Sequence, residues 1–274
     1  MIMKALKDGY ESVKKHFGVI LGMWLPVLIV SLFGEGLLNS AGSGFLSMTN
    51  PGFYLFLTCV TLILGTLFTV SFQYGLLKSD QDGKFEFKRA FVAFDGLTWI
   101  GIIVISFLVG LIGFLFIFFF GLLAGGFLFS AVTEMNYAMI AVAAVITIIG
   151  GLAYLFIALS LYFVFFTYFT DTKGTDDGIF KAFPKTWKLM KGHRWQLLGL
   201  LVIEWLIELV VAIVLAMLSA IVIWLVLMIT SFGIKVAVGA ILGLVVFVIG
   251  LVAFVSLTLW FSMTSVKFFE ALNK

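Results

Sequence analysis

The stretch VAVGAILGLVVFVIGLVAFVSLTLWF, residues 236–261, decides the fold class of this chain. It contains no charged residue, and about 20 consecutive apolar residues are enough to cross a bilayer as a helix. A second such run, GVILGMWLPVLIVSLFG, occupies residues 18–34. Of all 274 residues, 63% are hydrophobic and 11% are charged, against roughly 25% charged residues in soluble domains. The composition therefore predicts an all-α integral membrane protein that forms a single transmembrane domain over residues 1–274.

Six apolar segments are long enough to span a membrane. They lie near residues 18–38, 53–77, 96–124, 136–170, 196–230 and 236–266. A helix as long as the fourth or fifth segment would extend about 52 Å, against a hydrocarbon core of about 30 Å. These two spans must therefore tilt, kink or include interfacial or re-entrant pieces. We expect breaks at Gly150–Gly151 and at Ser219–Ala220.

The basic residues predict the orientation of the chain. Four lysines precede the first span, and four basic residues lie between the second and third spans. Six more lie between the fourth and fifth spans, and two follow the sixth. Only Lys235 falls on the opposite side. Because cytoplasmic loops carry the excess of Lys and Arg, we expect both termini and both polar loops in the cytoplasm.

Two polar segments of the chain resemble each other. Residues 3–22 read MKALKDGYESVKKHFGVILG, and residues 180–199 read FKAFPKTWKLMKGHRWQLLG. In each segment three bulky apolar residues recur at spacings of four and three, which places them on one helix face. Phe87, Phe91 and Phe94 repeat this spacing before the third span. Internal repeats are common in membrane folds. We therefore predict three pseudo-repeats, about 1–77, 84–170 and 176–269, each an amphipathic cytoplasmic helix followed by a transmembrane hairpin.

The second of these segments predicts a basic surface at the membrane interface. Its members are Lys181, Lys185, Lys188, Lys191, Arg194, Trp187 and Trp195. Each basic residue near an anionic leaflet contributes about 1 kcal/mol of attraction. One interpretation is an interfacial collar that fixes the topology. The other is a docking surface for anionic lipid headgroups or for a membrane protein partner. A net charge of +3 argues against a nucleic-acid partner.

Two glutamates interrupt the fifth span in VIEWLIELVV, residues 202–211. Glu204 and Glu208 are four residues apart, and they lie about 13 Å and about 19 Å beyond Trp195 along the helix. An ionised carboxylate at such depth costs about 2.5–3.5 kcal/mol or more, so we expect both to be protonated and to face the bundle interior. Candidate partners on the second span are Thr58, Thr61, Thr69 and Gln73. The alternatives are a proton or cation site, a path for a polar headgroup, and a helix-packing contact.

Sequence motifs of enzymes are absent. The chain has no HExxH, P-loop or GxSxG pattern, and its one cysteine, Cys59, has no histidine near it in the sequence. We therefore predict that the protein is not an enzyme and that it uses no cofactor and no metal.

Two stretches carry a resemblance to known proteins. In KTWKLMKGHRWQLLGLLVIEW, residues 185–205, the LMKG sequence and two tryptophans recur as in a group of uncharacterised bacterial integral membrane proteins. In YGLLKSDQDGKFEFKRAFVAF, residues 74–94, the chain is similar to the same group in a glycine, a basic loop and a Phe-rich helix. The group is related to the membrane domain found upstream of some glycerophosphodiester phosphodiesterases. The resemblance implies six helices in a bacterial cytoplasmic (inner) membrane, and it does not imply the phosphodiesterase activity. The chain departs from the group in Thr186, where Ser is frequent, and in its glutamate pair.

Two function classes follow. The first is a membrane accessory or interaction protein that binds lipid or a partner, which includes roles in envelope stress and in resistance or immunity to membrane-active peptides. The second is a small secondary transporter of a polar solute or lipid that uses Glu204 and Glu208. Because the basic helix recurs while the acidic pair occurs once, the sequence favours the accessory role.

Overall fold

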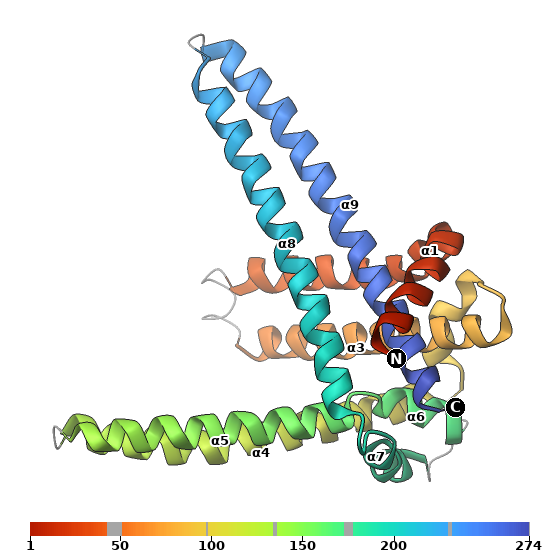
Figure 1. Cartoon of the computed structure of the whole chain (residues 1–274), viewed down its shortest axis with the longest axis vertical. Coiled ribbons are helices and arrows are strands. Elements are labelled where there is room, and N and C mark those ends of the chain that lie inside the picture. Colours follow the sequence, from red (N-terminus) through yellow and green to blue (C-terminus); the bar gives the residue numbers. More distant parts are fainter. Residues whose placement is uncertain (43–50, 97, 134–135, 173–177, 230–231, 274) are drawn as a thin grey trace. The chain divides into compact units, whose positions relative to one another are not determined.

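The computed structural model describes residues 1–42, 51–96, 98–133, 136–172, 178–229 and 232–273. Every regular element within these ranges is a helix (Figure 1). In chain order the elements are α1 (Ile2–Gly42), α3 (Pro51–Asp82), η1 (Phe87–Phe94), α4 (Thr98–Thr133), α5 (Tyr137–Leu161), α6 (Val164–Thr172), α7 (Gly178–Leu189), α8 (Arg194–Leu227) and α9 (Phe232–Leu272).

Six helical stretches are long and apolar enough to cross a membrane, as the hydropathy of the sequence predicts. They are Ile2–Gly34, Pro51–Asp82, Thr98–Thr133, Tyr137–Thr170, Arg194–Leu227 and Gly233–Leu272. The expectation of an all-α chain with six such segments is therefore confirmed.

The fourth span is interrupted, but not at the paired glycines. α5 continues through Gly150 and Gly151 and ends at Leu161. Two residues in a turn then separate it from α6. A Cβ atom on Gly150 would lie 2.6 Å from Cγ of Phe120 in α4. The predicted break is therefore wrong, because the glycine serves the close approach of α4 and α5, which run side by side (Figure 1).

The fifth span contains no break. α8 is continuous from Arg194 to Leu227, so the prediction of a kink at Ser219–Ala220 is also wrong. The Ser219 hydroxyl donates to the carbonyl of Leu215 at 2.8 Å, which satisfies it inside the helix. Such a bond lets a serine remain in a helix interior.

Two further helix interruptions occur at aligned histidines. α1 has non-helical dihedral angles at His16, with φ −121° and ψ 22°. The aligned His193 lies in the turn between α7 and α8. Gly192 in that turn has φ +88°, a conformation that glycine adopts without steric cost. The two similar polar segments are thus both interrupted as helices at the aligned histidine.

Contacts divide the chain into two compact units, and each is described by itself. The first combines Met1–Ile20 with Trp195–Leu272, so that it contains the start of α1 together with α8 and α9. The second is Leu21–Arg194 and contains the rest of α1 with α3 to α7.

The second unit has a well-packed apolar core formed by five of its helices. α3, η1, α4, α6 and α7 all contribute to it. Its fully or nearly fully buried members are Leu67, Val70, Ala93, Ile102, Ile105, Val164, Tyr168, Phe169 and Ala182. A Cβ atom on Gly101 would lie 2.0 Å from the Tyr168 hydroxyl, so the start of α4 packs closely against α6. This core fixes the ends of these helices relative to one another.

η1 packs on α3 through its alanines. Ala90 and Ala93 are buried, and the backbone N–H of Ala93 donates to Oγ of Ser71 at 3.0 Å. Phe91 and Phe94 are exposed on the surface. In a 3₁₀-helix, residues three apart share a face, so Phe87 shares a stripe with the two alanines, and Phe91 and Phe94 lie on another stripe. The Phe91 and Phe94 rings also contact the Phe68 ring of α3, with ring centres 6.0 Å and 5.1 Å apart, so both stripes of η1 contact α3.

α7 packs on α6 in the same manner. Its buried residues are Gly178, Ala182 and Thr186, which are four residues apart. The Thr186 hydroxyl is hydrogen-bonded to the Thr167 hydroxyl of α6, and both side chains are buried. A narrow stripe of small residues allows the two helices to approach closely.

The start of α1 packs on the end of α9 within the first unit. A Cβ atom on Gly9 would lie 2.7 Å from Oγ1 of Thr264 and 3.0 Å from its Cα. The Trp260 indole N–H donates to the carbonyl of Leu6 at 2.9 Å. Thus the start of α1, η1 and α7 each contact another helix through small residues, and a hydroxyl side chain lies close to each contact.

Candidate functional site

The basic surface predicted from the sequence is formed mainly by α7. Because Ala182 and Thr186 face α6, the lysines at positions 181, 185 and 188 lie on the exposed part of the helix. Lys191 is exposed in the turn that follows, and the Trp195 side chain is 79% exposed at the start of α8. The local fold thus keeps the basic and aromatic side chains of this segment at the surface.

Arg194 has a different environment from these lysines. Its guanidinium lies over the ring of Phe156 at 4.2 Å and over the ring of Trp187 at 4.8 Å. The Nε atom of Arg194 is buried and has no hydrogen-bond partner among the described residues. A cation between two aromatic faces is stabilised by both ring quadrupoles. Arg194 therefore holds Trp187 and the end of α7 in place, while the lysines remain at the surface.

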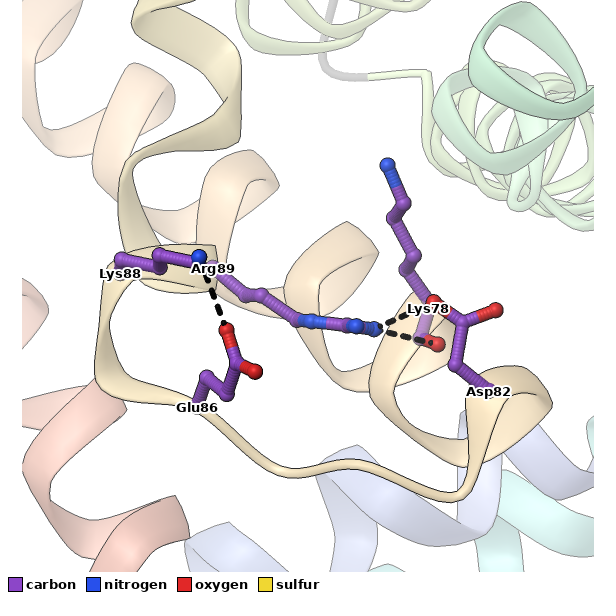
Figure 2. Close-up of polar contacts among 5 residues, drawn as sticks. All are labelled: Lys78, Asp82, Glu86, Lys88 and Arg89. Carbon is purple, nitrogen blue, oxygen red and sulfur yellow. Dashed lines mark hydrogen bonds and ion pairs between the residues drawn. The ribbon is translucent and has the colours of Figure 1, made fainter.

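A second polar region surrounds the end of α3. Arg89 of η1 reaches back to α3, donates from Nη1 to the carbonyl of Lys78 at 2.8 Å, and forms an ion pair with Oδ2 of Asp82 at 2.8 Å (Figure 2). Its side chain is only 13% exposed. Lys88 pairs with Glu86 at 3.2 Å on the open surface (Figure 2). Arg89 thus satisfies a free carbonyl near the C-terminal end of α3 and fixes the loop that follows.

Beside this ion pair lies a polar cleft, here named the Tyr74 cleft. It is formed by Tyr74, Lys78 and Gln81 of α3, Val92 of η1, Asp95, Thr98 of α4, and Phe169 and Thr170 of α6. Its volume of about 600 Å³ lies within the range of small-ligand sites, about 300–1,000 Å³. The rings of Tyr74 and Phe169 stack at 4.1 Å and form one wall. Sequence reasoning missed this cleft, because its residues come from four separate segments.

The two glutamates of α8 have unequal environments. Glu204 is 8% exposed, and its Oε1 atom has no hydrogen-bond partner among the described residues. Glu208 is exposed. In α8, Leu215 approaches Gly250 of α9, and Val226 approaches Gly239. The structure therefore buries one carboxyl group of the predicted pair and leaves the other at the surface.

The proposed partners of the glutamates lie in the second compact unit, whereas Glu204 lies in the first. Within α3, Thr58 donates to the carbonyl of Tyr54 at 2.9 Å, and Thr61 lies close to Gly34 of α1. Thr69 is exposed, and Gln73 is half-buried. These four residues therefore do not form one buried polar stripe.

The residues that the structure describes include no group of three or more His, Cys, Asp or Glu side chains that could hold a metal ion. The exposed Cys59 lies in the apolar part of α3.

The fold and the polar regions define a multi-pass helical protein with six membrane-spanning-length helices. Comparison with protein families, with curated proteins and with solved structures yields no match.

Proposed function

We propose that this chain is a non-enzymatic protein of a bacterial cytoplasmic membrane, with both termini in the cytoplasm. Its role is that of an accessory or interaction protein that binds anionic lipid headgroups at the surface of α7. The observation that carries this proposal is the burial of Ala182 and Thr186 against α6, which leaves the lysines of α7 exposed.

Charge and aromatic side chains on α7 support lipid binding. Basic residues attract an anionic leaflet by about 1 kcal/mol each when they lie near its surface. The exposed rings of Trp187 and Trp195 suit the headgroup region, where tryptophan is enriched. Arg194, held between Phe156 and Trp187, makes the end of α7 rigid. A rigid basic surface loses less conformational entropy when a headgroup binds.

The test is mass spectrometry of the protein extracted in patches of its native membrane. Enriched anionic lipid that is lost when the lysines of α7 are changed to glutamine would support the proposal. A stoichiometric protein partner lost in the same variant would assign the surface to protein docking instead. Unchanged lipid composition in the variant would contradict the proposal.

Glu204 favours a second candidate function, a small secondary transporter. A buried carboxyl group without a hydrogen-bond partner inside a span is costly, and such residues often belong to substrate or proton pathways. The variant Glu204→Gln should then abolish proton-coupled uptake of a retained solute, while Glu208→Gln, at an exposed position, should have a smaller effect. Full activity of the Glu204→Gln variant would exclude this function.

A further inference from the structure

We infer that the Tyr74 cleft binds a phosphate group joined to a primary ammonium group, as in the headgroup of phosphatidylethanolamine. This site is separate from the basic surface of α7 and does not depend on the function proposed for that surface. The inference follows from the position of the cleft and from its arrangement of hydrogen-bond donors and acceptors.

The cleft lies where the apolar sequence of α3 ends. Residues 53–72 of α3 include no charged residue, and Lys78 lies about 9 Å beyond Phe72 along the helix. The headgroup layer on each side of a bilayer is roughly 5–8 Å thick. If this run spans the hydrocarbon core, the Lys78 backbone stands just outside the headgroup layer, and the long Lys78 side chain can reach the lipid headgroups.

Lys78 supplies a positive charge that has no ion-pair partner among the residues that the structure describes. Its carbonyl accepts a hydrogen bond from Arg89, but its ammonium has no ion pair within the ranges that the structure describes. In Figure 2 the Lys78 side chain points away from the pair of Arg89 and Asp82. Gln81, one turn further along α3, adds an amide donor to the same cleft. These groups suit an anionic phosphate.

Three other residues of the cleft, Asp95, Thr98 and Thr170, supply hydrogen-bond acceptors. The Thr98 hydroxyl donates to the carbonyl of Asp95 at 2.6 Å, and the Thr170 hydroxyl donates to the carbonyl of Phe166 at 2.9 Å. Since each hydroxyl has a single proton, both oxygens can then only accept a further hydrogen bond. The Asp95 carboxylate likewise has no ion pair in the described part of the chain. Three acceptors of this kind suit a primary ammonium with its three N–H groups.

The aromatic wall favours ethanolamine over choline. A quaternary ammonium is recognised by several open aromatic faces. Here Tyr74 and Phe169 stack on each other at 4.1 Å, so each ring offers at most one face. The primary ammonium, which can donate hydrogen bonds, fits the threonine and aspartate oxygens better.

The experiment uses the full chain in bilayer discs that contain equal amounts of phosphatidylethanolamine, phosphatidylcholine and phosphatidylglycerol. Native mass spectrometry then counts the lipids that each protein retains. The wild type should retain phosphatidylethanolamine in preference to phosphatidylcholine. Lys78→Gln and Asp95→Asn should each reduce this retention about fivefold, the effect of one ion pair of about 1 kcal/mol.

Matched control variants remove one lysine charge and one aspartate charge at positions outside the cleft. Lys84→Gln changes an exposed lysine in the loop after α3, and Asp8→Asn changes a half-buried aspartate of α1. Both should retain lipid as the wild type does. Helix content and thermal stability, measured for every variant, identify any loss of retention that is due to misfolding.

Soluble glycerophosphoethanolamine distinguishes a lipid ligand from a water-soluble ligand with the same headgroup. If the protein retains phosphatidylethanolamine and the soluble compound does not displace it, the ligand is the lipid. If the soluble compound binds and the lipid is not retained, the ligand is a solute with the same headgroup. Equal retention of ethanolamine and choline lipids without solute binding, or unchanged retention in both cleft variants, would overturn the inference. The lysine variants of α7 leave this result unaffected, so the two proposals fail independently.

Discussion

The indole N–H of Trp260 donates a hydrogen bond to the backbone carbonyl of Leu6 at 2.9 Å, across 254 positions of sequence. The Tyr10 ring packs edge-on against the same indole, with the ring centres 5.8 Å apart. The first helical turns of α1 are thus attached to the end of the last helix. This contact explains why Met1–Ile20 belongs to the same compact unit as α8 and α9.

Replacement of Trp260 by Phe should loosen the start of α1. The change removes one hydrogen bond, which contributes about 0.5–1.5 kcal/mol. Amide hydrogen exchange in residues 2–15 should therefore become about fivefold faster for a loss of about 1 kcal/mol. Trp99→Phe, at an exposed tryptophan of α4, is the matched control and should leave this exchange unchanged. Equal exchange in the Trp260→Phe variant and the wild type would show that the bond does not hold the helix.

Gly9→Ala should destabilise the same contact through a steric clash. The new methyl group would lie 3.0 Å from the backbone N and Cα of Thr264, which a side-chain rotation cannot relieve. Overpacking of this kind costs about 1–3 kcal/mol. Gly18→Ala is the control, because a methyl group there would meet nothing within 4 Å. Thermal unfolding in detergent should show a lower midpoint for Gly9→Ala alone, and equal midpoints would contradict the packing described.

The two ion pairs of the loop after α3 should differ in their contribution to stability. Arg89→Gln removes a nearly buried charged donor from the Lys78 carbonyl and from Asp82, and this should cost about 1.5–3 kcal/mol. Lys88→Gln removes a surface pair that contributes about 0–1 kcal/mol. Hydrogen exchange at the end of α3, residues 76–83, measures both. Similar effects of the two changes would show that Arg89 does not anchor this helix end.

The spans were predictable because bilayer thickness sets a minimum length for an apolar helix. The orientation of the chain, its three pseudo-repeats and its bacterial origin stay predictions. The packing of the short helices could not be read from hydropathy, because the contact residues Gly9, Ala93 and Thr186 are small and only weakly apolar. Their spacing offers a signal, since Ala5 and Gly9 correspond to Ala182 and Thr186 in the aligned segments. The hydroxyl pair of Thr186 and Thr167 also gives a physical reason for Ser or Thr at this position.

The environment of the glutamate pair was less predictable. Residues four apart on an α-helix differ by about 40° in direction, so Glu204 and Glu208 share a face only approximately. Glu204 is buried, whereas the next half-buried positions of α8 are Ile207 and Val211 rather than Glu208. The Tyr74 cleft could not be predicted from the sequence for another reason. Asp95 and Thr170 line it together with Lys78 only after α3, η1, α4 and α6 have packed.

The central claim, that α7 binds anionic lipid, is tested most directly by counting the anionic lipids that each purified protein retains from its native membrane. Two variants are compared, one with Lys181, Lys185, Lys188 and Lys191 changed to Gln and one with the same residues changed to Arg. We predict at least about a tenfold loss of anionic lipid in the glutamine variant, since each lysine contributes about 1 kcal/mol, and near wild-type retention in the arginine variant. Equal retention of anionic lipid by both variants would contradict the account.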